Sequence, residues 1–198
     1  MTAVEGVEFS LPGVWWSLDL RDSDAAIKGR INAILEEAVG RADNRASARH
    51  AIRDGLLQVA AQGKAIKAHQ VHIARSLVGD IPLAATLLIS RPGVAVPDLH
   101  SPQDTAAGML TLIPGDDPTI IENSALAVVR SVERAPSPSD PSVTTHVTIN
   151  YWIALPQGAR LVVFTFSSPL AMYEKELLTL FDAIAMTTTA SMNKGRAQ

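Results

Sequence analysis

The stretch Val143–Leu155, with the sequence VTTHVTINYWIAL, alternates apolar and polar residues more regularly than any other part of the chain. A repeat of two residues is typical of a β-strand, and one apolar and one polar face are typical of an antiparallel sheet. The apolar face comprises Val147, Ile149, Tyr151, Ile153 and Leu155, and the polar face comprises Thr144, His146, Thr148 and Asn150. Pro156-Gln157-Gly158 predicts a turn into a second strand, Arg160–Ser167, so the two strands should form a hairpin.

Other segments upstream of this hairpin are also predicted to be strands. They are Val7–Leu11, Val14–Leu20 after a Pro12-Gly13 turn, Ala65–Leu77, Leu83–Ser90 and Ser124–Arg134. The alanines of Ala65–Leu77 would also suit a helix, but the alternation of Val71 and Ile73 favours a strand. We expect residues 91–118 to form a long loop with a short helix at Gln103–Leu110, in which Asp116-Asp117 is a solvated turn.

Three segments repeat apolar residues at the spacing of one helical face. The first runs from Ser23 to Gly40, with Ser23 or Asp24 as the candidate N-cap, and the second from Asn44 to Gln62, with Gly63 as the expected stop. The third follows Pro169 and presents Leu170, Tyr173, Leu177, Leu180, Phe181 and Ile184. Because few residues separate the first two helices, they should pack together as an antiparallel hairpin.

The predicted fold is α+β, with an antiparallel sheet packed against an N-terminal helical hairpin and a C-terminal helix. Residues 1–188 should form a single domain, and residues 189–198 a polar tail that frays. A chain of 198 residues of which 47% are hydrophobic is large enough for one such core.

Composition excludes several classes of protein. With no cysteine the chain has no disulfide, no thiol nucleophile and no Cys-ligated metal. A formal charge of −3 argues against nucleic-acid binding. No run approaches the roughly 18 apolar residues of a membrane span, and the first ten residues lack the pattern of a secretory signal, so we expect a cytoplasmic protein without membrane contact.

The chain also lacks the common motifs of catalysis and of cofactor binding. G-x-S-x-G, Walker A, G-x-G-x-x-G and H-E-x-x-H are all absent. His69 and His72 have a metal-ligand spacing on a helix, but on a strand their separation directs them to opposite faces. The sequence therefore predicts no enzyme, no cofactor and no metal.

Four arginines form the most regular charge pattern in the chain. Arg41, Arg45, Arg49 and Arg53 are spaced by four, so they lie along one side of the second helix. Their guanidinium groups could bind an acidic partner, since each offers a planar fork of donors. The alternative is that they pair with nearby acidic residues and keep the helix solvated, the candidates being Glu36, Glu37, Asp43 and Asp54.

Three tryptophans are the second candidate for partner contact. Trp15 and Trp16 are adjacent and should face opposite sides of their strand, while Trp152 is on the polar face of its own strand. Large amphipathic rings dominate many binding surfaces. The alternative is that the helices simply cover them.

The two ends of the chain carry a further pattern. Val7-Glu8-Phe9-Ser10-Leu11-Pro12-Gly13-Val14-Trp15 opens it, and Val162–Pro169 with Leu177–Ala185 closes it. Together they resemble actinobacterial proteins of unknown function with a PsbP-like α+β fold. The resemblance implies a similar fold and a role as a non-enzymatic partner binder, such as a secretion chaperone or an accessory subunit.

These observations lead to one main functional hypothesis. We expect a non-catalytic protein–protein interaction module, chaperone-like or accessory to a secretion or toxin system, that binds a protein partner or a second copy of itself. The alternative is a small-molecule-binding protein or hydrolase that uses the cleft between helices and sheet, with His69, His72 or His146 as polar contacts.

Overall fold

The computed structural model describes residues 2–4, 6–40, 46–77, 81–94, 96, 101–114, 116–137, 139–140, 142–156 and 160–190. Its elements are β1 (Thr2–Val4), β2 (Val7–Phe9), β3 (Val14–Asp19), α1 (Asp24–Val39), α2 (Ala46–Ala65), β4 (Ala68–Ser76), β5 (Thr86–Ser90), α3 (Pro102–Met109), β6 (Asp116–Ile121), β7 (Ala127–Pro136), β8 (Thr144–Leu155), β9 (Arg160–Ser168), the 3-10 turn η2 (Ala171–Tyr173), α4 (Glu174–Met186) and β10 (Thr189–Ala190).

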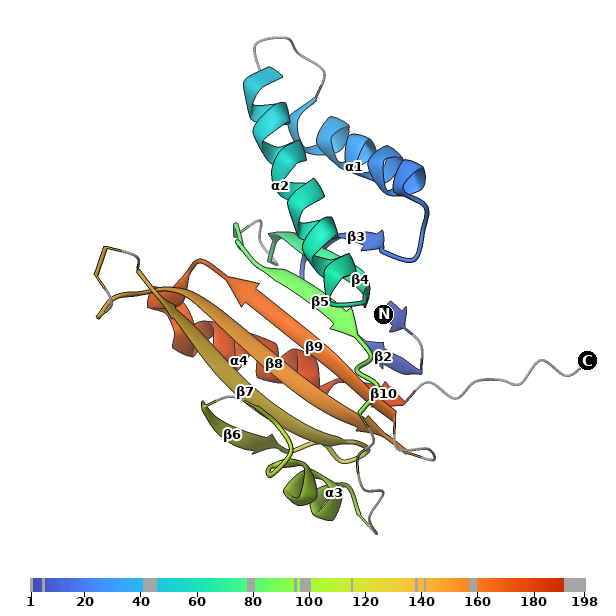
Figure 1. Cartoon of the computed structure of the whole chain (residues 1–198), viewed down its shortest axis with the longest axis vertical. Coiled ribbons are helices and arrows are strands. Elements are labelled where there is room, and N and C mark those ends of the chain that lie inside the picture. Colours follow the sequence, from blue (N-terminus) through green and yellow to red (C-terminus); the bar gives the residue numbers. More distant parts are fainter. Residues whose placement is uncertain are drawn as a thin grey trace, which may run out of the picture.

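The main element is an antiparallel sheet in the order β3-β4-β5-β9-β8-β7-β6, and a smaller sheet has the order β1-β2-β10. The predicted hairpin is present, with β8 paired along its length to β9. The α+β fold is confirmed: a seven-stranded antiparallel sheet contacts an N-terminal helix pair and a C-terminal helix (Figure 1).

Helix α4 and strand β2 cover one face of the sheet. Phe181 of α4 stacks on Phe166 of β9 with ring centroids 4.1 Å apart, and both are fully buried. Asp182 accepts a hydrogen bond of 2.7 Å from the Tyr151 hydroxyl and pairs with Arg130 at 2.6 Å. One carboxylate therefore joins α4 to both β8 and β7.

The other face is covered in two separate places. Helices α1 and α2 pack on the β3-β4-β5 side in one apolar cluster, and α3 packs on one end of β7, β8 and β9 in another (Figure 1). Between them lies a polar strip, whose side chains hydrogen-bond across the strands: Ser131, Glu133, His146, Asn150, Thr165 and Ser167. The prediction of a wet face is wrong at Asn150, which is buried.

Two predicted boundaries are wrong for identifiable reasons. Helix α2 continues through Gly63 to Ala65, because this glycine serves close packing: a Cβ there would lie 2.5 Å from Leu20 Cδ1. Asp116-Asp117 belongs to edge strand β6 and not to a turn. A register shift between Asp116 and Thr119 accommodates Pro118, which an edge strand tolerates.

The last helix begins later than predicted, and part of the predicted tail belongs to a strand. Proline 169 lies before the 3-10 turn η2, and α4 begins only at Glu174, because Ser168 still belongs to β9. Within the segment expected as a polar tail, Thr189–Ala190 pairs with β2. Residues 191–198 lie outside the described residues.

The stacked pair of phenylalanines gives a stability prediction. Replacing Phe181 by Ala leaves a cavity between α4 and β9, so the free energy of unfolding should fall by about 3–5 kcal/mol. Urea unfolding followed by circular dichroism measures this. The control is Met172→Ala, since that side chain is 82% exposed and its loss should change the free energy by less than about 0.5 kcal/mol. Equal losses in both variants would contradict the assignment.

Candidate functional site

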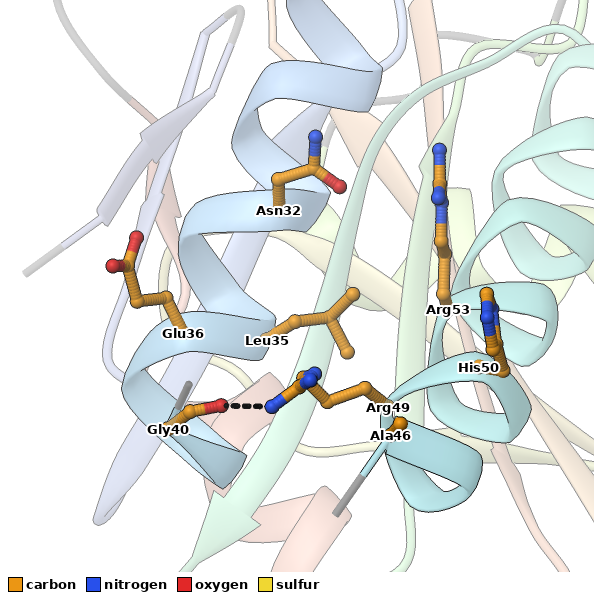
Figure 2. A pocket seen from close by; sticks show the side chains of 8 residues that line it. All are labelled: Asn32, Leu35, Glu36, Gly40, Ala46, Arg49, His50 and Arg53. Carbon is orange, nitrogen blue, oxygen red and sulfur yellow. Dashed lines mark hydrogen bonds between the residues drawn. The ribbon is translucent and has the colours of Figure 1, made fainter. Parts of the chain in front are cut away.

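A pocket of about 410 Å³ lies between α1 and α2. Its lining is Asn32, Leu35, Glu36 and Gly40 at the α1 side, and Ala46, Arg49, His50 and Arg53 on α2 (Figure 2). On α2, Arg49 and His50 lie three and four residues after Ala46, and Arg53 lies four and three residues after them, which places all of these residues on one helical face. Leu35 is apolar and buried at this pocket, whereas Arg49 and Arg53 are basic, so the pocket combines an apolar floor with a basic wall.

The predicted arginine row is found in part on this wall. Arg49 is half-buried and donates a hydrogen bond of 3.0 Å to the Gly40 carbonyl at the end of α1 (Figure 2). Arg53 is also half-buried, and among the described residues it has neither a hydrogen bond nor an ion pair. Arg41 and Arg45 lie outside the described residues.

Not all of the acidic residues predicted as possible partners of the four arginines pair with them. Glu37 pairs instead with Arg75 of β4 at 3.1 Å. Glu36 lines the pocket and is the acidic residue among the described residues that do so. The described lining residues thus include two basic side chains, Arg49 and Arg53, and one acidic side chain, Glu36.

The structure places the three tryptophans in two distant regions. Trp15 packs against the α4-side core and donates to the Pro12 carbonyl at 2.8 Å. Trp16 packs against the α1–α2 cluster, and the Arg75 guanidinium lies 5.9 Å from its ring. The prediction that they face opposite sides is confirmed. Trp152 on β8 is four strand positions away, roughly 19 Å at the usual strand spacing.

Trp152 itself is half-buried beneath the segment that carries α3. Its Nε1 donates to Ser131 Oγ at 3.2 Å, and its ring lines an apolar pocket of about 210 Å³ with residues such as Met109 and Leu161. The three rings thus do not form one surface.

His69 and His72 do not form a ligand pair with a third group. Among the described residues, no cluster of three metal-ligating side chains is present. His72 is buried under the edge of Phe9, with ring centroids 5.9 Å apart. Burial lowers the pKa of His72 from 6.5 to about 4, so this ring is neutral at pH 7.

A second pocket, of about 510 Å³, lies between α2 and the sheet. His146 and Ser167 reach it from neighbouring strands, and their Nε2 and Oγ atoms are 2.6 Å apart. The sequence suggested His146 for such a cleft. It gave no signal for Ser167 beyond placing that residue at the end of the predicted strand Arg160–Ser167.

No protein-family model, curated protein or solved structure matches this chain. Among the described helices, none has the length and apolar character needed to span a bilayer. The resemblance to the PsbP-like group stays a prediction.

The buried histidine predicts a pH dependence of stability. An unfolded His72 binds a proton near pH 6.5, whereas the folded one does so only near pH 4. Between these values the unfolded state binds more protons, so stability falls as the pH is lowered from 6.5 to 4, by up to about 3 kcal/mol.

Unfolding in urea at pH 7 and pH 4.5 tests this. In His72→Leu the difference between the two pH values should shrink by most of that amount, whereas His50→Gln, at an exposed position, should keep the full difference. The same pH dependence in both variants would mean that His72 is not the titrating group.

Proposed function

We propose that this protein is a non-catalytic protein-interaction module, whose α1–α2 pocket binds an acidic segment of a partner protein. The observation that carries the proposal is Arg53: it faces a pocket between two helices, half-buried, with no ionic partner among the described residues. A role as chaperone or accessory subunit agrees with the resemblance at the two ends of the chain.

Charge and shape favour a carboxylate. Arg49 and Arg53 lie one helical turn apart on the same wall, and a guanidinium binds a carboxylate through two parallel hydrogen bonds. Both groups are partly shielded from water, which strengthens their attraction to an anion. Hydrogen bonds to charged groups contribute about 1.5–3 kcal/mol each, enough for a peptide side chain to be held here.

The surroundings favour a peptide over a polynucleotide. The chain as a whole carries a charge of −3, which repels a phosphate backbone. Ile52, three residues after Arg49, is 39% exposed on the adjoining surface of α2. A segment with acidic and apolar residues would therefore contact the arginines and Ile52 together.

A labelled peptide tests the chemistry of the site. The probe is fluorescein-Glu-Glu-Leu-Glu-Glu-amide, and fluorescence anisotropy measures its binding at 50 mM salt. Arg53→Gln should weaken binding about tenfold, since one charge-assisted hydrogen-bonded contact is lost. Arg160→Gln removes the same charge from the exposed start of β9 and should change binding less than about twofold.

Higher salt should weaken peptide binding by the wild-type protein more than peptide binding by Arg53→Gln, because the lost contact is ionic. Equal affinity of both arginine variants would contradict the proposal.

Purification from the native host tests the cellular role. A protein that co-elutes with the wild type and with Arg160→Gln, but not with Arg53→Gln, would support an interaction module that uses this pocket. A wild-type protein that elutes alone at native abundance, or a partner retained by Arg53→Gln, would count against it.

A further inference from the structure

We infer that the pocket between α2 and the sheet is a second, independent site that binds a small neutral molecule with a carbonyl or amide group and a short apolar body. The lining consists of Val59 and Gln62 of α2 with Ile73, Ala74, Ala84, Ala85, Thr86, His146, Ser167 and Pro169. A volume of about 510 Å³ falls within the range of pockets that hold small ligands.

The polar groups in this pocket are few and come from four elements, α2, β5, β8 and β9. The hydroxyl of Ser167 and the imidazole of His146 form one hydrogen-bonded pair at 2.6 Å. The side chains of Gln62 and Thr86 make no hydrogen bond with any residue that the structure describes. A ligand with both donor and acceptor atoms would satisfy groups that otherwise face only water.

The His146–Ser167 pair can serve a carbonyl ligand with either histidine tautomer. When Nε2 carries the proton it donates to Ser167, and the hydroxyl is then free to donate to the ligand carbonyl. When Nε2 accepts from Ser167, the serine oxygen accepts from a ligand N–H instead. An amide offers both groups, so it matches the pair in either state.

The remaining lining defines the rest of the ligand. Val59, Ile73 and Pro169 contribute apolar surface to the same pocket. No Asp, Glu, Lys or Arg is present among the described residues that line the pocket. Burying a charged ligand group here would leave it without an opposite charge, which is costly, so the preferred ligand is neutral.

The geometry favours binding over hydrolysis. A catalytic serine and histidine need a third group that orients the imidazole. Within the part of the chain that the structure describes, nothing hydrogen-bonds to Nδ1 of His146. The pair therefore holds a carbonyl without the arrangement needed to cleave it.

Nuclear magnetic resonance of the full chain tests the inference with butyramide as the probe. Titration should shift the imidazole Cε1–Hε1 signal of His146 in a saturable way, and the signals of exposed His50 should not move. Butylammonium has the same length but a charged head, and it should not shift His146.

Two substitutions test which groups make the contact. Ser167→Ala and Thr86→Val each remove one hydroxyl and keep a similar volume, so each should weaken butyramide binding about fivefold. Ser47→Ala, at the exposed start of α2, should have no effect. Absence of a saturable His146 shift, an equal response to butylammonium, or wild-type affinity in both Ser167→Ala and Thr86→Val would overturn the inference. Since Arg53 is outside this pocket, Arg53→Gln should bind butyramide normally.

Discussion

The seven-stranded sheet has two faces, and the helices cover these faces in different ways. Helix α4 lies along one face. Its Asp182 accepts a hydrogen bond from the Tyr151 hydroxyl and forms an ion pair with Arg130. Its Phe181 stacks on Phe166 of β9. The opposite face receives α1–α2 and α3 at separate places. Between these two places, the described strands carry polar side chains that hydrogen-bond to one another. The neutral pocket lies at the α2 side of this polar strip.

The side chains of the polar strip hydrogen-bond to one another across neighbouring strands. Asn150 accepts from Thr165 at 2.8 Å and donates to Glu133 at 3.0 Å, so its amide is satisfied although it is buried. Each such bond contributes only about 1 kcal/mol, but an unpaired amide at the same depth would cost more than that. The strip is therefore compatible with an open face, and it leaves Ser167 and His146 at its α2 border to contact a ligand.

The sequence predicted the sheet better than the sites. Alternation in Val143–Leu155 identified β8 and its inward face, since a period of two is a local property. The burial of Asn150 could not be predicted, because it depends on side chains from the strands on both sides of it. The predicted hairpin placed Ser167 on the strand beside His146, but it could not show that their side chains come within 2.6 Å of each other. The spacing of Arg49 and Arg53 correctly gave one helical face, but spacing cannot show that α1 closes a pocket opposite it.

One glycine determines how closely the end of α2 approaches the sheet. Gly63 lets α2 approach the sheet so closely that a Cβ would lie 2.5 Å from Leu20 Cδ1 and 3.1 Å from Leu88 Cδ2. The end of α2 is thus fixed against β5, with Leu56 and Ala60 buried in the turns before it. Among the described residues, the first half of α2 buries no side chain, and its Arg49 donates a hydrogen bond to the Gly40 carbonyl at the end of α1. The same helix is therefore tightly anchored where it borders the neutral pocket and loosely supported where it presents its arginines, which suits a small ligand at one end and an extended acidic segment at the other.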